Sequence, residues 1–377
     1  MSKIIMFLLT LMVFQLLLLL AAALQGFYKY FLLTELNLRE RYGVGSWVVI
    51  TGASSGQGYD LAMAFAERGF NLLLIGSKRT EETVTQIQKA YPGIQTKVLY
   101  KDFRQAFQDD FFVDIQAAFE ELGDDLAILV NNVGHRVGWN PYHAMNADYI
   151  RDVIATGAVV QSRLTHMAIP YFLKRASAAA PSEAAPSEAA PSEAAPSEAG
   201  RPSKKSALIN ITAQCMHPNF LFGLTLPNEI SVPYLSVYEA ANAFGFYQGN
   251  SIYKEYQGQF DILNITPGAV ITKNTTCLSD TLFNVSSPVF VKQIMKMVGN
   301  VQGHSCAYWG HALSNYLINL MPLLKDRMLK KVGETIAADF MAKADGAKYD
   351  IKSATLGPAT LGPATLVNSA STSTLSE

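Results

Sequence analysis

The chain has 377 residues, of which 49% are apolar and only 16% charged, and its formal net charge is −1. This length suffices for one large domain with appendages, and the near-neutral charge gives no reason to expect a nucleic-acid partner. The three cysteines, Cys215, Cys277 and Cys306, lie far apart without metal-ligand spacing, so they predict reduced thiols and no metal site.

The first predicted element is a membrane-spanning helix over residues 4–24, preceded by a short tip at residues 1–3. Residues 4–24 carry no charge, and a helix of about twenty apolar residues crosses a bilayer core of ~30 Å. A cleaved signal peptide is the alternative, although this apolar run exceeds the roughly 7–15 residues of a signal-peptide core. Residues 25–43 follow as a juxtamembrane linker, in which Tyr28 and Tyr30 suit the membrane interface.

The charges that flank this helix predict its orientation. Only Lys3 precedes it, whereas Lys29, Arg39 and Arg41 follow it. Because positive residues tend to stay on the cytosolic side, we expect the rest of the chain to face the cytosol.

The middle of the chain, residues 44–300, predicts a single doubly wound α/β domain of the Rossmann type. Short runs rich in valine, isoleucine and leucine alternate with segments whose apolar residues recur at helical spacing. Because the strands are apolar on both faces, they favour a parallel sheet that helices cover on two sides. The expected strands are 46–52, 70–77, 95–103, 126–134, 206–212 and 260–266, and the expected helices are 59–69, 80–93, 106–123, 148–174 and 236–255.

Two low-complexity segments interrupt or follow this domain. Residues 178–204 contain the five-residue unit APSEA in four tandem copies, and residues 346–377 form a tail. Proline in every unit stops a continuous helix and no apolar face can be buried, so we expect a disordered loop, and we expect the tail to be unstructured as well. The loop joins a helix to the next strand, which places it away from the sheet edge where ligands bind. Two interpretations of the loop are possible: it is a tolerated expansion, or it docks a partner or is phosphorylated.

Residues 301–345 predict a helical extension. From Trp309 onward, apolar residues recur at near-helical spacing before a basic end, and Pro322 breaks the pattern. A helix packed on the domain and a helix lying on the membrane explain this pattern equally well.

A glycine-rich stretch between the first strand and the first helix of the domain predicts a nucleotide site. Gly52 permits a tight turn, Gly56 lets the backbone approach a pyrophosphate, and Gly58 lets helix and strand pack closely. Ser54 and Ser55 belong to the same loop. Free N–H groups and the helix dipole favour phosphates at the following helix N-terminus.

The end of the second strand indicates which dinucleotide binds. An acidic residue there would bind the ribose of NAD, but the chain has Ser77, Lys78 and Arg79 instead. A hydroxyl and two cations suit a 2′-phosphate, so we expect NADP(H). The alternative is that Lys78 and Arg79 simply begin a solvated helix.

These motifs together resemble the short-chain dehydrogenase/reductase family. The spacing TG-xxx-G-x-G matches its glycine motif, and NNVG at Asn131–Gly134 follows the fourth strand as NNAG does in that family. PGAV at Pro267–Val270 follows the sixth strand, where the family closes over the nicotinamide, and Asp102 stands where the family contacts adenine. The resemblance therefore adds six residues to the predicted cofactor-binding set, namely Asp102, Asn131, Gly134, Pro267, Gly268 and Val270.

The resemblance narrows to a membrane-bound branch. The N-terminal span, "GSWVVITGASSG", "SVPYLSVY" and "GHALSNYLINLMP" are similar to very-long-chain 3-ketoacyl-CoA reductases and 17-beta-hydroxysteroid dehydrogenases, over nearly the whole chain except the APSEA loop and the tail. Membership would imply the endoplasmic reticulum membrane, a role in lipid metabolism and NADPH-dependent reduction of an acyl-CoA or steroid-like ketone. Whether the chain forms a homo- or hetero-oligomer stays open.

The catalytic positions of this family are only partly retained. In the family a tyrosine donates the proton, a lysine four residues later lowers its pKa, a serine polarises the carbonyl, and an asparagine positions a water. Tyr238 is the tyrosine, but the lysine position is Asn242 and the serine position is Ala213. Thr212 beside it is a candidate substitute hydroxyl. The asparagine position, counted back from Pro170 as the end of its helix, is Gly157.

Two functional hypotheses follow from these changes. An amide carries no charge that could lower a phenol pKa from ~10, and general acid catalysis contributes ~10²–10⁴-fold. The chain is therefore either a reductase with a rebuilt proton relay, using Thr212, Tyr234 or a water, or an inactive relative that binds NADP(H), a lipid or a partner as a subunit or sensor.

Overall fold

A computed structural model of the protein describes residues 2–178, 204–213, 219–221, 224–226, 231–272, 275, 281–319 and 321–344. The predicted disorder of the APSEA repeats and of the tail concerns residues that lie outside this described part, as do Cys215 and Cys277. Cys306 is a buried thiol.

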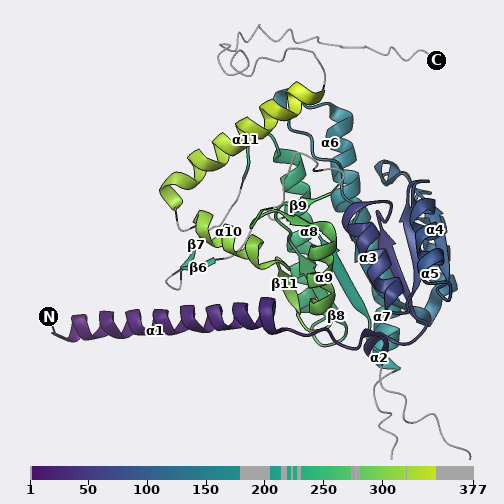
Figure 1. The fold of residues 1–377 in the computed structure, drawn as a ribbon, viewed down its shortest axis with the longest axis horizontal. Coiled ribbons are helices and arrows are strands. Elements are labelled where there is room, and N and C mark those ends of the chain that lie inside the picture. The colour runs from purple at the N-terminus through teal and green to yellow at the C-terminus, as the bar shows by residue number, and fades with distance from the viewer. Residues whose placement is uncertain are drawn as a thin grey trace, which may run out of the picture.

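The centre of the molecule is a seven-stranded sheet with the order β11-β8-β5-β4-β1-β2-β3, and every neighbouring pair of strands is parallel (Figure 1). This arrangement confirms the predicted doubly wound α/β class. The strands of this sheet are β1 (Trp47–Thr51), β2 (Asn71–Gly76), β3 (Thr96–Tyr100), β4 (Leu126–Asn131), β5 (Ala207–Ile211), β8 (Asp261–Ile265) and β11 (Gly303–Ser305). Two small pairs accompany it: β6 (Asn219–Leu221) with β7 (Leu224–Leu226), and β9 (Val270–Ile271) with β10 (Val285–Ser286).

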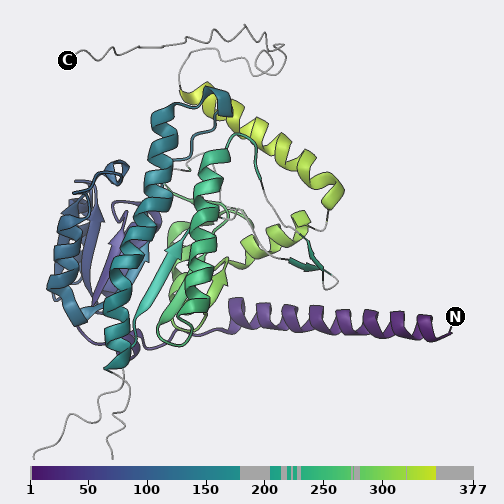
Figure 2. The ribbon, with the colours of Figure 1, turned by 180° about the vertical axis from the view of Figure 1, so that it is seen from behind.

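Helices cover both faces of the sheet because its central strands are apolar on both sides. In β1, Val48 and Ile50 pack into one buried cluster, whereas Val49 packs into the other. Helices α3 (Gly56–Glu67), α4 (Thr80–Ala90) and α9 (Ser287–Met297) contribute to the first cluster, and α5 (Val113–Leu122), α7 (Val160–Ser177) and α8 (Ser236–Glu255) contribute to the second. Figure 2 shows the second layer from behind.

Two of the predicted boundaries need correction. Strand β11 continues the sheet past residue 300, where we expected the domain to end; its sequence, Gly-His-Ser, is too short and too polar to read as a strand. The predicted helix 148–174 is three pieces, namely α6 (Ala147–Ile154), a π-helical turn η5 (Ala155–Val159) and α7. Pro170 does not end α7 but lies inside it, because buried Ala168 and Phe172 hold the helix against the sheet on both sides of the proline.

The N-terminal helix is longer than predicted. Helix α1 (Ser2–Phe27) runs on into a π-helical turn η1 (Tyr28–Leu32), and the most apolar 18-residue window of the stretch Lys3–Leu32 has a mean hydropathy of 2.8. It is long and apolar enough to cross a membrane, and none of its most apolar window is buried in the protein. Figure 1 shows α1 projecting from the body of the molecule.

Short turns and two further helices complete the chain. The predicted break at Pro322 is confirmed, because it separates α10 (Trp309–Asn319) from α11 (Pro322–Ala344). The short elements are α2 (Leu38–Tyr42), η2 (Phe103–Gln105), η3 (Gly123–Asp125) and η4 (Tyr142–Ala144).

A buried carboxylate joins the linker after the anchor to the sheet. Asp261, at the start of β8, accepts hydrogen bonds from Arg41 Nε at 2.6 Å, Tyr42 Oη at 2.7 Å and Gln302 Nε2 at 2.7 Å. Burial, together with the Asp261 charge, raises the pKa of the Tyr42 phenol, which therefore stays a donor at neutral pH. These bonds hold α2 against the amino-terminal edge of the sheet.

Replacing Asp261 by alanine should destabilise the protein strongly, because three donors would lose a common acceptor. We expect Asp261→Ala to lower the free energy of unfolding by about 2–3 kcal/mol in denaturant titrations of the detergent-solubilised chain. The control is Glu121→Ala, which breaks the exposed ion pair to Lys97 and should cost below ~1 kcal/mol. Equal losses in the two variants would contradict the importance of this junction.

Candidate functional site

A cleft lies where the winding of the sheet changes direction. Strand β1 has β2 on one side and β4 on the other, and ligands of such sheets bind beyond the carboxyl ends at this point. The cleft has a volume of about 750 Å³. Its lining includes the predicted cofactor residues Gly52, Ser54, Ser55, Gly56, Gly58, Ser77, Lys78, Arg79, Asp102, Gly134, Pro267, Gly268 and Val270, and the catalytic positions Gly157, Thr212, Ala213, Tyr238 and Asn242.

The glycines of the loop between β1 and α3 are required by its geometry. Gly52 and Gly56 have φ angles of 71° and 58°, a backbone region that side chains disfavour. A Cβ on Gly58 would collide with the Gly52 carbonyl oxygen and lie 2.5 Å from Asn132 Nδ2. Ser55, at the N-cap of α3, has an extended backbone, and its hydroxyl forms no hydrogen bond with the helix. The first N–H groups of α3 therefore face the cleft and can donate hydrogen bonds to an anion.

The cations at the end of β2 differ from Lys101, which also lines the cleft. Lys101 is paired with Asp114 at 2.5 Å. Lys78 and Arg79 are exposed, and neither forms an ion pair with any residue in the described part of the chain. Their charges are therefore available to an anion in the cleft.

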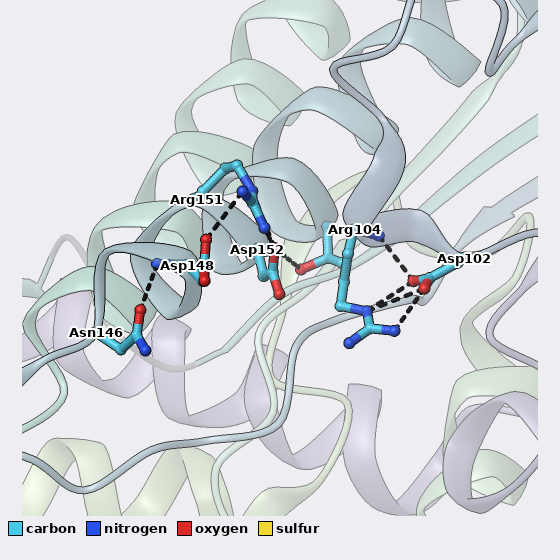
Figure 3. A network of polar contacts seen from close by, with 7 residues as sticks. Asp102, Arg104, Asn146, Asp148, Arg151 and Asp152 are labelled. Carbon is cyan, nitrogen blue, oxygen red and sulfur yellow. Dashed lines mark hydrogen bonds and ion pairs between the residues drawn. The ribbon is translucent and has the colours of Figure 1, made fainter.

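The rim beside Asp102 is held by ion pairs (Figure 3). Arg104 donates to the Asp102 carboxylate from Nε at 2.9 Å and from Nη2 at 2.5 Å, and these hydrogen bonds lower the pKa of Asp102. On the neighbouring helix α6, Arg151 pairs with Asp148 at 3.0 Å and with Asp152 at 3.1 Å. Asp102 thus lines the cleft as a charged carboxylate, and its contact with adenine stays a prediction.

One predicted cofactor residue has a structural position instead. Asn131 is buried and does not line the cleft; its Nδ2 donates to Thr165 Oγ1 and to Asn210 Oδ1, both at 2.9 Å. Asn132 lines the cleft in its place and donates from Nδ2 to the Thr51 carbonyl at 2.9 Å. Because successive residues of a strand point to opposite faces, only one of the two asparagines can reach the site.

Asn242, at the predicted lysine position, and Thr212, the candidate substitute hydroxyl, both have backbone partners. Asn242 lies one helical turn after Tyr238 on α8, and its Nδ2 donates to the Tyr238 carbonyl oxygen at 2.8 Å. The Thr212 hydroxyl donates to the Ile265 carbonyl at 3.2 Å, the same oxygen that accepts the Thr212 N–H. Each side chain lines the cleft and at the same time donates a hydrogen bond to a backbone carbonyl oxygen.

The asparagine position of the family falls in the π-helical turn η5. Gly157 packs so closely on α8 that a Cβ there would lie 3.0 Å from the Cβ of Ala241. Such turns are common at functional sites, since they open the helical ladder. The structure thus places Gly157 beside α8, and its assignment as the asparagine position of the family stays a prediction.

Comparison with known proteins agrees with this geometry. A model of the family described as short chain dehydrogenase matches residues 46–180. This match, together with the relatives that follow, supports membership of the short-chain dehydrogenase/reductase family. The very-long-chain 3-oxoacyl-CoA reductase of Emericella nidulans is 26% identical over 330 residues, which cover 84% of this chain and 83% of that protein. The 17-beta-hydroxysteroid dehydrogenase type 3 of Homo sapiens is 25% identical over 283 residues, covering 74% of this chain and 76% of that one.

Solved structures share the fold of this chain. A short-chain dehydrogenase from Sphingobium yanoikuyae in complex with NADPH superposes with a TM-score of 0.52 at 17% identity, over 81% of this chain and 99% of that one. A structure of a 7beta-hydroxysteroid dehydrogenase gives a TM-score of 0.56 at 18% identity, over 74% of this chain and 93% of that one.

Two residues that the sequence did not single out lie at or beside the cleft. Gln161 of α7 is buried, lines the cleft and donates from Nε2 to the Gly245 carbonyl at 3.1 Å. His311 of α10 is fully buried, and its Nε2 lies 3.2 Å from the carbonyl of Ala269, in the turn that follows β8. Burial lowers the pKa of His311, so the ring is neutral at pH 7. The sequence did contain a signal for Gln161, since it is a polar residue on the buried face of a predicted helix.

The close packing at Gly58 leads to a testable consequence. Gly58→Ala should lower the free energy of unfolding by about 1–3 kcal/mol, because the added methyl group meets backbone that cannot move freely. Gly134→Ala is the matched control on the same cleft, since a Cβ there has no heavy atom within 4 Å. Thermal unfolding of both variants measures the difference, and a Gly58→Ala protein as stable as its control would contradict the packing.

Proposed function

We propose that this protein is a membrane-anchored, NADP(H)-dependent reductase of hydrophobic ketones whose proton donation is impaired. The observation that carries the proposal is the meeting of the glycine loop, two cations and Tyr238 in one cleft. The relatives named 3-oxoacyl-CoA reductase and 17-beta-hydroxysteroid dehydrogenase support an acyl-CoA or steroid-like substrate.

The cleft suits NADP(H) through its own residues. The N–H groups of the Gly52–Gly58 loop would hold the pyrophosphate, while Lys78 and Arg79 would hold the 2′-phosphate. The turn at Pro267–Val270 would cover the nicotinamide end. When bound, NADP(H) supplies the hydride for ketone reduction.

The proton would come from Tyr238. Its phenol would donate to the oxygen of the ketone as that oxygen gains negative charge. Asn242 adds no positive charge beside the phenol, and Ala213 has no hydroxyl to polarise the carbonyl. We therefore expect turnover well below that of an enzyme with the complete set of groups.

A second candidate function follows from the same positions. Three of the four catalytic positions are altered, and the Asn242 amide bonds to its own helix. A pseudoenzyme that binds NADP(H) or a lipid, and acts as a subunit or sensor in a homo- or hetero-oligomer, has no need of the missing groups. Both candidates share the cleft, so cofactor binding alone does not separate them.

The proposed location is the endoplasmic reticulum membrane. Helix α1 would be the single anchor, with the dehydrogenase domain on the cytosolic side, because more basic residues follow the helix than precede it. A bilayer-anchored reductase would meet lipid substrates where they dissolve.

The choice of NADP(H) over NAD(H) depends on two side chains. Lys78→Ala combined with Arg79→Ala should weaken NADPH binding by about tenfold or more, since two cations near the 2′-phosphate are lost, and should leave NADH binding unchanged. Fluorescence titration of the detergent-solubilised protein measures both affinities. Lys97→Ala removes a cation that does not line the cleft and serves as the control. A parallel loss for NADH would contradict the assignment.

Rebuilding the missing groups tests the chemistry. We expect Ala213→Ser with Asn242→Lys to raise the rate of NADPH oxidation with a 3-ketoacyl-CoA by about 10²-fold, because the pair restores the hydroxyl and the charge. Tyr238→Phe should abolish the activity in both the natural and the rebuilt chain.

The outcomes separate the two candidates. Slow turnover in the natural chain that is lost in Tyr238→Phe supports the reductase, whereas NADPH binding without oxidation supports the pseudoenzyme. A rebuilt chain that binds NADPH and stays inactive would contradict the role of Tyr238 as proton donor.

A further inference from the structure

An apolar stripe runs along the C-terminal helices. It consists of Leu317 on α10, Met321 in the connection, and Leu324, Met328 and Val332 on α11, each between 37% and 50% exposed. Leu324, Met328 and Val332 follow one another at four-residue spacing and so form one row on α11, while Leu317 and Met321 precede that row along the chain. Exposed apolar side chains gathered in this way need a partner.

Helix α11 is docked on the domain by a different face. Leu329 and Ala337 are buried, and Gly333 lies so close to the body that a Cβ there would be 3.0 Å from the Pro233 carbonyl oxygen. At about 100° per residue, this docked face points well away from Leu324, Met328 and Val332. The stripe is therefore directed outward by the packing of the helix.

The stripe continues from the membrane anchor. Phe31, at the end of the apolar stretch Lys3–Leu32, lies with its ring 6.0 Å from the ring of Trp309, the first residue of α10. Phe31 itself is more than half exposed. Figures 1 and 2 agree that α1, α10 and α11 lie on the same side of the molecule, opposite α4 and α5.

Basic residues flank the stripe. Lys325 and Lys331 fall on its two sides at about 100° per residue, and Arg327 and Lys330 lie on the same turns of α11. A helix with an apolar row between lysines is typical of one that lies in a membrane interface, where the lysines meet anionic head groups.

We propose that the stripe lies in the surface of the bilayer that α1 enters, as a second lipid contact of the chain. This inference rests on the proposed anchoring by α1. The opposite face of α10 carries His311, which reaches the turn at Ala269 beside the cleft. Leu317 of the stripe and the His311 contact to the turn at Ala269 are thus both on α10, which leads directly into α11. Contact of the stripe with the bilayer would therefore set how the cleft is oriented toward lipid.

Depth measurements on the full chain test the proposal. Single cysteines replace Leu324, Met328 or Val332, in a chain whose Cys215 and Cys277 are serine, and carry an environment-sensitive fluorophore. Cys306 is buried, and the parent without an added cysteine gives its background labelling. The protein is reconstituted in phosphatidylcholine–phosphatidylserine vesicles, with or without doxyl-labelled lipid. Each variant must keep the thermal unfolding midpoint of the parent.

Matched controls lie on the same helix and in the anchor. Lys330→Cys and Glu334→Cys are on α11 but away from the stripe, and Leu17→Cys reports insertion of α1. We expect blue-shifted emission and doxyl quenching at the three stripe positions and at Leu17, and water-like emission at the two controls on α11.

Each other outcome contradicts a defined statement. Quenching at Leu17 with water-like emission at all α11 positions would overturn the second lipid contact while leaving the anchor intact. Absence of quenching at Leu17 would overturn the anchoring itself. Blue-shifted stripe positions that lipid-borne doxyl does not quench, and that lose the shift when the protein is diluted in lipid, would mean that a second copy of the chain covers the stripe.

Discussion

The close approach of α3 to the end of β1 is the contact on which the cleft depends. It is possible only because Gly58 has no side chain where it passes the Gly52 carbonyl. This approach points the first N–H groups of α3 into the space beyond the sheet, where a phosphate can bind. The cations after β2 and the turn after β8 reach the same space because parallel strands end at the same edge.

A row of amides holds that edge together from within. Asn131, Asn210 and Asn264 occupy the same level on three neighbouring strands, and each donates to the next at 2.9 Å. Gly249 on α8 makes room for this row, because a Cβ there would collide with Asn264 Oδ1. Polar groups buried in this way fix the register of the strands, since a shift by one residue would leave them without partners.

Helix α8 keeps the geometry of the proposed site while it carries an amide at the predicted lysine position. Tyr238 still lines the cleft, and Asn242 still occupies the next turn of α8. The amide, however, bonds to the helix backbone at 2.8 Å. A lysine at this position would supply a positive charge to its surroundings, whereas a neutral amide supplies only a dipole.

The sequence by itself determined the alternation of strands and helices, the N-terminal apolar helix and the glycine loop, because each depends on local periodicity or on a motif along the chain. Tertiary structure alone decided that β11 joins the sheet, that α7 runs through Pro170 and that Asn132 rather than Asn131 faces the cleft. It also decided the partners of Asn242 and His311 and the outward direction of the stripe on α11. These features depend on which face a residue presents to distant neighbours, and packing sets that face after the local elements have formed.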